Sequence, residues 1–276
     1  MKDIHNSFSF LPFYLLLLAV PAALKAQVKE PELFERQLFL QGDDTLPCRI
    51  LSPIHFSSEK KYPLVIFLHG SGERGNDNEA QLTWGSKVFL DSATREKFPA
   101  IVVFPQCPAD SSWSVRIKGR SKDSTSPFQF PMDVPASRPL KMVMSFIDTL
   151  LKSGFVDSSR VYIGGLSMGG FGAFEILWRR PSLFAAAFPI CGGGNPASAK
   201  LYGQDFPIWV FHGTDDDVVP VANSRVMVHA LKAAGAKVKY TEYPGVKHDS
   251  WIKVFAEPAL LPWLFEQKKN AVPGVY

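Results

Sequence analysis

The feature that most restricts the fold of this chain is an apolar run that ends in a Gly-x-Ser-x-Gly sequence. Residues 161–164 read Val-Tyr-Ile-Gly, and Gly-Leu-Ser-Met-Gly follows at residues 165–169. Beyond it, residues 171–178 carry apolar side chains at helical spacing, and Pro181 limits the run. Glycines flanking Ser167 allow a turn too tight for a Cβ at either position. We therefore predict a strand, a sharp elbow and a helix.

A serine at the tip of such an elbow lies above the N-terminus of a helix. The backbone N–H of Met168 would then point to where negative charge forms on an attacked carbonyl group. The pattern predicts Ser167 as a nucleophile and Met168 as one oxyanion-binding amide. The competing interpretation is a glycine-rich turn that contains a serine by chance.

A nucleophilic serine needs a histidine base, and the chain has six histidines. His248 follows every other predicted element, in a polar loop at residues 244–249 between a strand and the last helix. His69 and His212 each end an apolar run and precede glycine, which indicates loop-shaping roles. Three others lie in unsuitable segments: His5, His55 and His229. We predict His248 as the base; the alternative is a solvated loop histidine.

A carboxylate to orient that base is expected upstream, where the apolar run 208–211 leads into Asp215, Asp216 and Asp217. The chain order is then Ser, Asp, His, which differs from the order in chymotrypsin-like and subtilisin-like proteases. Three adjacent aspartates cannot all face one imidazole, and spacing alone does not choose among them. The cluster could also be a solvated turn or a cation site.

Four blocks together resemble the phospholipase/carboxylesterase branch of the α/β hydrolases, and they are also similar to dienelactone-hydrolase-like and feruloyl-esterase-like bacterial esterases. The resemblance covers residues 34–268. The blocks are Leu68 to Asp77, Gly164 to Gly170, His212 to Pro220 and Pro244 to His248. The resemblance implies that Asp216, the fifth residue of His-Gly-x-x-Asp, is the acid. It also implies that the backbone N–H of Ser71 is the second oxyanion donor.

Strands and helices alternate along the chain, which is typical of an α/β protein. Phe34–Leu40 and Leu46–Ser52 read as an antiparallel hairpin. With the resemblance, the pattern predicts an α/β-hydrolase fold: a mostly parallel central sheet, an antiparallel N-terminal edge hairpin, and helices on both faces. Further strands are expected at 64–68, 101–104, 161–164, 186–191, 208–211 and 238–243, and helices at 140–152, 171–180, 223–234 and 256–267.

Residues 1–26 combine a basic start with an apolar stretch that prolines interrupt at positions 12 and 21. This stretch is too short and too broken for a stable membrane anchor, so we predict a cleaved secretory signal peptide and a secreted or periplasmic protein. Residues 27–276 then form a single catalytic domain. The net charge is +4 and the basic residues are scattered, which argues against nucleic-acid binding.

The three cysteines, Cys48, Cys107 and Cys191, show no metal-type spacing, and no metal or organic cofactor is expected. Cys107 and Cys191 each follow a predicted strand, so export could join them, although free thiols are slightly favoured.

Residues 111–139 form a long polar segment that starts beside the predicted active edge, and we interpret it as a lid or binding loop. Trp113, Phe128 and Phe130 in this loop, and Trp251 near His248, are candidate substrate-binding residues. The alternative is that these rings pin the loop to the core.

The sequence thus favours an exported serine carboxylic-ester hydrolase that forms an acyl-enzyme on a small-molecule or oligosaccharide ester. Export and the feruloyl-esterase-like resemblance point to acylated plant carbohydrate, with feruloyl or acetyl groups. Two alternatives remain: an exported peptidase of the prolyl-oligopeptidase type, and a non-catalytic binding protein on a hydrolase scaffold.

Overall fold

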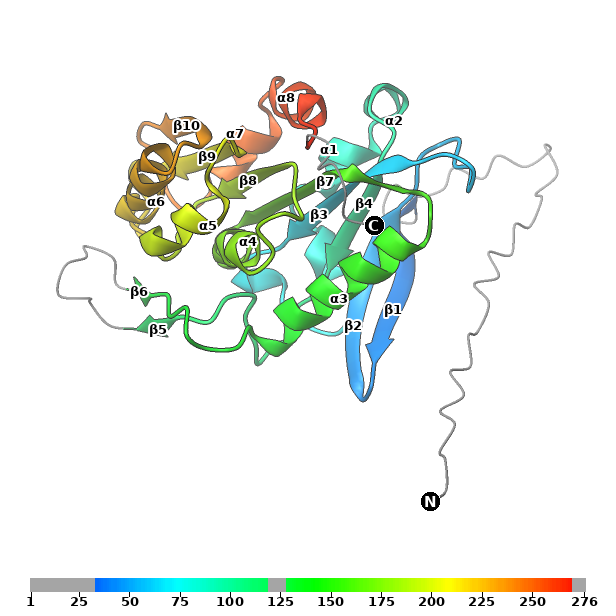
Figure 1. Cartoon of the computed structure of the whole chain (residues 1–276), viewed down its shortest axis with the longest axis horizontal. Coiled ribbons are helices and arrows are strands. Elements are labelled where there is room, and N and C mark those ends of the chain that lie inside the picture. The colour runs from blue at the N-terminus through cyan, green and yellow to red at the C-terminus, as the bar shows by residue number, and fades with distance from the viewer. Residues whose placement is uncertain (1–32, 119–127, 270–276) are drawn as a thin grey trace, which may run out of the picture.

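A computed structural model of the chain describes residues 33–118 and 128–269, so the predicted signal peptide lies outside the described part. Its centre is an eight-stranded sheet in the order β1-β2-β4-β3-β7-β8-β9-β10 (Figure 1). β1 and β2 form an antiparallel pair, β2 is antiparallel to β4, and the other neighbours are parallel. The strands are β1 (Glu35–Gln41), β2 (Asp44–Leu51), β3 (Tyr62–Leu68), β4 (Ile101–Pro105), β7 (Val156–Leu166), β8 (Ala186–Ile190), β9 (Pro207–Gly213) and β10 (Lys237–Tyr243). The predicted sheet and its edge hairpin are confirmed.

Helices cover both faces of this sheet because its central strands are apolar on both sides. In β3, Leu64, Ile66 and Leu68 belong to one buried cluster, and Val65 and Phe67 belong to another. The first cluster includes residues of α3, α4 and α6, and the second includes residues of α1, α7 and α8. The helices are α1 (Ser86–Leu90), α2 (Ser92–Lys97), α3 (Arg138–Lys152), α4 (Met168–Arg179), α5 (Ala199–Tyr202), α6 (Ala222–Ala233), α7 (Trp251–Phe255) and α8 (Leu260–Glu266).

The C-terminal helix expected at 256–267 is confirmed in part, as α8 at Leu260–Glu266. It begins four residues later than expected, and an unpredicted short helix, α7, precedes it, with residues 256–259 between the two. Pro258 lies in this break; it lacks a backbone N–H and disfavours helical backbone at Glu257. α7 ends before this break, and it begins at Trp251, directly after the loop that carries His248.

The long segment 111–139 has some structure of its own. β5 (Ile117–Lys118) pairs with β6 (Phe128–Gln129) in an antiparallel ribbon, and residues 119–127 between them lie outside the described part. The rings of Phe128 and Phe130 lie 5.6 and 5.4 Å from that of Phe171, in the first turn of α4. The segment therefore packs beside the helix that follows the elbow.

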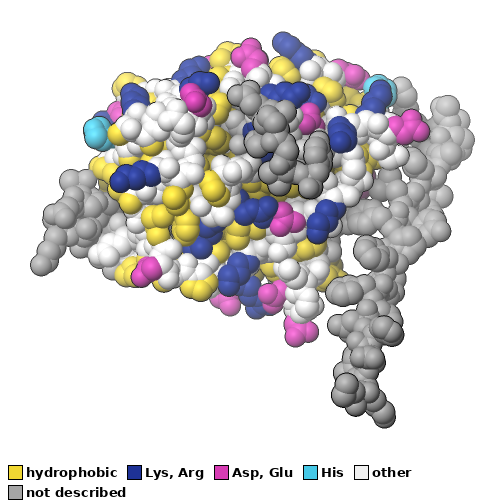
Figure 2. All heavy atoms as spheres, in the orientation of Figure 1, with side chains coloured by type: hydrophobic (Ala, Val, Ile, Leu, Met, Phe, Trp, Pro, Cys, Tyr) yellow, Lys and Arg dark blue, Asp and Glu magenta, His cyan; other side chains and the backbone are white. Residues whose placement is uncertain are grey.

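The visible surface mixes charges of both signs. Figure 2 shows Lys and Arg side chains interspersed with Asp and Glu, with no broad basic face in this view. None of the helices in residues 33–118 and 128–269 is long and apolar enough to cross a membrane.

All three cysteines are buried free thiols in the structure, so we expect three reactive thiols in the denatured, unreduced protein. Burial raises the pKa of Cys107 to about 12, and it raises the pKa values of Cys48 and Cys191 as well. Titration of the native protein with a chromogenic thiol reagent near neutral pH should therefore be slow. A count of one thiol after denaturation would instead mean that two cysteines are bridged.

Candidate active site

The elbow between β7 and α4 places Ser167 in a strained conformation. Its backbone angles are φ 52° and ψ −114°, outside the regions that side-chain-bearing residues normally occupy. A Cβ on Gly169 would lie 1.8 Å from the carbonyl oxygen of Leu68, and one on Gly165 would lie 2.3 Å from that of Gly169. Both flanking glycines are therefore required for the close approach of the elbow to the end of β3.

The structure brings the three residues predicted for a catalytic triad into one hydrogen-bonded chain. The hydroxyl oxygen of Ser167 lies 2.9 Å from Nε2 of His248, and Nδ1 of His248 lies 2.7 Å from Oδ2 of Asp216. The His248 side chain is 16% exposed and the Asp216 side chain is fully buried. This series of hydrogen bonds therefore leads from the partly exposed His248 side chain to the fully buried Asp216 carboxylate.

The structure also distinguishes the three adjacent aspartates. Asp216 points inward, and its Oδ1 accepts hydrogen bonds from the backbone amides of Val218 and Val219 at 3.0 and 2.8 Å. Asp215 instead accepts a bond from the neighbouring Thr214 hydroxyl, and the exposed Asp217 carboxylate faces Lys247. Of the three aspartates, Asp216 is the one whose carboxylate contacts the imidazole of His248.

The environment of Asp216 keeps its carboxyl group ionised. Burial alone would raise its pKa, but contacts from the imidazoles of His212 and His248 and the Val219 amide outweigh burial and hold the pKa well below its usual range. A charged carboxylate next to Nδ1 favours the His248 tautomer with the proton on Nδ1. Nε2 is then free to accept the hydroxyl proton of Ser167.

Both amides predicted to bind an oxyanion belong to backbone beside Ser167. Met168 is the first residue of α4, where N–H groups have no partner in the preceding turn of the helix. Ser71 follows Gly70, at which a Cβ would lie only 3.7 Å from Cβ of Ser167. The loop after β3 therefore passes directly alongside Ser167.

The two histidines predicted to shape loops are both buried. Nδ1 of His69 lies 2.6 Å from the Gly70 carbonyl oxygen, and its Nε2 accepts the Cys107 N–H at 2.9 Å. Burial lowers the pKa of His69 to about 4, so the neutral ring joins two loops at the active edge. His212 differs, because its Nε2 lies 3.3 Å from Oδ2 of Asp216. Sequence reasoning missed this contact, although His212 ends a strand only four residues before that acid.

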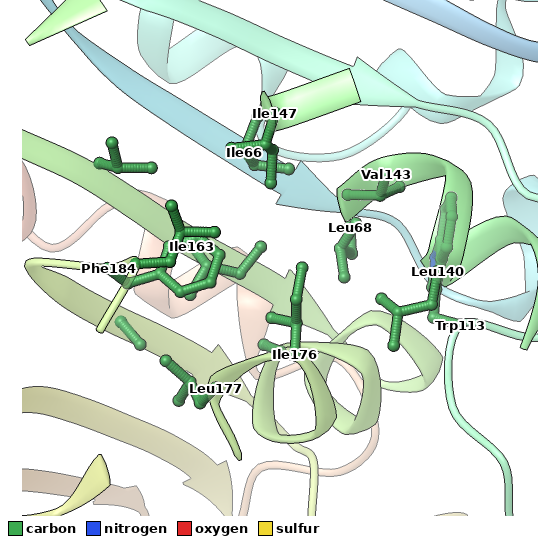
Figure 3. Close-up of a cluster of buried hydrophobic side chains, with 14 of the residues drawn as sticks. Ile66, Leu68, Trp113, Leu140, Val143, Ile147, Ile163, Ile176, Leu177 and Phe184 are labelled. Atoms are coloured by element: carbon green, nitrogen blue, oxygen red, sulfur yellow. The ribbon is translucent and has the colours of Figure 1, made fainter. Parts of the chain in front are cut away.

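Trp113 is placed in the core rather than at the predicted substrate-binding site. It is fully buried, and its indole N–H donates to the His69 carbonyl oxygen at 3.1 Å. Figure 3 shows the ring beside Leu140 and near Leu68, inside the cluster between α3 and β3. The interpretation that this ring pins the loop to the core is therefore correct for Trp113.

Trp251 lies at the site as predicted, with its ring 5.4 Å from that of His248 and nearly perpendicular to it. Its indole nitrogen is buried and contacts no hydrogen-bond acceptor in the described part of the chain. The ring also lies near Trp84, with 5.8 Å between the ring centroids. The rings of the two tryptophans are therefore neighbours, and that of Trp251 lies beside His248.

Cys191, Asp216 and His248 offer ligand atoms within 4.8 Å of one another, which is compatible with a metal ion in distance alone. Asp216 and His248 already hydrogen-bond each other, and burial keeps the Cys191 thiol protonated.

A cavity of about 670 Å³ opens elsewhere, among Tyr62, Phe98 and Arg160 at the amino ends of β3 and β7, and the triad does not line it.

The fold and this site define an α/β hydrolase. The family model for Phospholipase/Carboxylesterase matches residues 121–257. A solved thermostable esterase is 40% identical with a TM-score of 0.76, and the match covers 87% of this chain and 64% of that one. The chain is therefore similar to α/β hydrolases of the carboxylesterase type and shares their fold.

Two curated proteins are also similar. The bifunctional acetylxylan esterase/xylanase XynS20E of Neocallimastix patriciarum is 28% identical over 68% of this chain and 26% of its own length. Lysophospholipase-like protein 1 of Mus musculus is 27% identical over 74% of this chain and 85% of its own. The chain thus spans about a quarter of the first relative and under two thirds of the solved esterase.

Proposed function

We propose that the protein is an exported serine carboxylic-ester hydrolase. Ser167 attacks the ester carbonyl carbon while Nε2 of His248 takes the hydroxyl proton, and Asp216 stabilises the imidazolium that forms. The amides of Ser71 and Met168 bind the oxyanion. His248 then protonates the leaving alcohol, which leaves an acyl group on Ser167. Water, activated by the same imidazole, releases the acid and restores the hydroxyl.

The observation that carries this proposal is the hydrogen-bonded chain from Ser167 through His248 to Asp216, with distances of 2.9 and 2.7 Å. Both distances lie within the reach required for proton transfer. The strained backbone of Ser167 adds support, because strain of this kind concentrates at functional sites.

For the substrate, we propose acylated plant carbohydrate with acetyl or feruloyl esters. The similarity to a protein described as an acetylxylan esterase/xylanase supports this class. The neighbouring rings of Trp84 and Trp251 near His248 also fit, because aromatic rings provide flat apolar surfaces for sugar or phenolic rings. The proposal of export rests on the apolar segment within residues 1–26. An exported enzyme would be found where such polymers occur.

A screen of the purified protein tests the proposal. The panel would contain p-nitrophenyl acetate and butyrate, methyl ferulate, acetylated xylan and aminoacyl anilides. We expect hydrolysis of the short esters and of at least one carbohydrate or ferulate ester. Turnover of anilides but not of esters would favour a peptidase, and no turnover of any substrate would favour a binding protein.

Ester turnover should fall on acidification, because His248 must be neutral to accept the Ser167 proton. Imidazoles ordinarily titrate at about pH 6.5. The lowered pKa of Asp216, in contrast, keeps this acid ionised over the whole pH range of the assay. The acidic limb of a kcat/KM profile should therefore correspond to the binding of one proton by a single group. A profile that is flat from about pH 5 to 8 would argue against histidine base catalysis.

A further inference from the structure

Asp216 lies between two imidazoles rather than one. His212, at the end of β9, is fully buried, and its Nε2 lies 2.8 Å from the Val219 carbonyl oxygen and 3.3 Å from Oδ2 of Asp216. Both neighbours accept hydrogen bonds, so Nε2 of His212 carries a proton. This N–H therefore faces the same carboxylate oxygen that accepts from His248 at 2.7 Å.

The other nitrogen of His212 fixes the orientation of the ring. Nδ1 lies 2.7 Å from the hydroxyl oxygen of Ser224 in α6, and that hydroxyl lies 3.1 Å from the Gly192 carbonyl oxygen in the loop after β8. Ser224 is fully buried, like His212 itself. Because Ser224 of α6 contacts Nδ1 and the Val219 carbonyl oxygen contacts Nε2, the ring cannot turn Nε2 away from Asp216 without breaking these contacts.

The other titratable groups around this pair carry little competing charge. The Cys191 thiol lies near Asp216, and burial raises its pKa, so it stays neutral. Glu242 on β10 faces His212 but forms an ion pair with Arg225 at 2.7 Å. Asp249 acts on the Cys191 thiol and helps to raise its pKa. Each carboxylate oxygen of Asp216 therefore meets two donors, backbone amides at Oδ1 and imidazoles at Oδ2.

We propose that His212 is a positioning residue for the proposed catalytic relay, and this inference rests on the proposed function. Its N–H holds Oδ2 of Asp216 in line with His248 and withdraws negative charge from that oxygen. A carboxylate with fewer donors stabilises a neighbouring imidazolium more strongly. Loss of the His212 donor should therefore both misalign Asp216 and strengthen proton binding by His248.

Two substitutions separate the functions of the two ring nitrogens. His212→Asn places an amide near the position of Nδ1, so it can keep the Ser224 contact but cannot reach Asp216. His212→Gln places its amide near Nε2 and can still donate to Asp216. We expect the Asn variant to lose about 10- to 100-fold in kcat with little change in KM. Its acidic limb should move to higher pH by about half a unit or more.

The Gln variant should recover most of the kcat and the original acidic limb, with a melting temperature close to that of the Asn variant. Wild-type kcat and pH profile in the Asn variant would overturn the inference. Equal losses in both variants with an unshifted limb would also overturn it, because His212 would then be only structural.

Ser224→Ala provides a second test in case His212→Asn does not fold. This change keeps the His212 ring but releases its Nδ1, so we expect a kcat loss of about two- to tenfold and a limb shift in the same direction. An unchanged profile would overturn the inference. Failure of the proposed function is a separate result, since it would appear in the parent protein as missing ester turnover or a missing acidic limb.

Discussion

Replacement of Ser167 by alanine should lower kcat for ester hydrolysis by about 10⁴- to 10⁶-fold. The hydroxyl is the only group in the proposed mechanism that forms the acyl bond, and the 2.9 Å contact with His248 is the route by which its proton leaves. The fold should survive, because the elbow depends on Gly165 and Gly169, which pack against backbone, rather than on the hydroxyl.

Steady-state rates on p-nitrophenyl acetate measure this prediction, with circular dichroism and the melting temperature as controls for the fold. Ser71→Ala is a matched control, since it removes a hydroxyl at the same edge but leaves the backbone N–H proposed to bind the oxyanion. This variant should stay within a few-fold of the parent. More than a tenth of the parent activity in the Ser167 variant would mean that another group is the nucleophile.

The second large effect is expected at Asp216. Asp216→Asn should lower kcat by about 10⁴-fold, because an amide facing Nδ1 no longer favours the tautomer in which Nε2 can accept a proton. The side chain is fully buried, and its Oδ1 contacts two backbone amides, so the isosteric asparagine retains much of the local packing.

Asp215→Asn and Asp217→Asn are the matched controls, because all three substitutions remove one charge within three consecutive residues. The Asp215 carboxylate accepts a hydrogen bond from the hydroxyl of its neighbour Thr214, and Asp217 faces Lys247 at 3.8 Å on the surface. Both variants should keep activity within about threefold of the parent, because exposed ion pairs contribute little. Similar rates for all three variants would contradict the assignment of Asp216 as the orienting acid.

Much of the fold was predictable because local patterns and global packing agree in this chain. The apolar runs that form β3, β4, β8 and β9 are buried on both faces, so they appear in the sequence as continuous apolar stretches. The helix expected at 256–267 begins only at Leu260, after Pro258, which lacks a backbone N–H. The short helices α1 and α2 also escaped prediction, since they have too few turns to show a periodic pattern.

The sequence by itself predicted the elbow and, apart from the choice among three aspartates, the residues of the proposed triad. Only glycine fits at positions 165 and 169, and the order of Ser167, the aspartate cluster and His248 follows the strands that carry them. These features are local, or they depend on strand order, so a single chain can reveal them.

Tertiary structure alone decided which side chains meet once the strands are packed. It turned the Asp216 side chain inward and those of its neighbours outward. It also buried Trp113 in the core rather than at the expected substrate-binding site, and it placed His212 against Asp216. These outcomes depend on where α6, β9 and the loop after β8 lie in space relative to one another. Side-chain direction in a loop follows from such packing and not from residue type, which is why the sequence left these choices open.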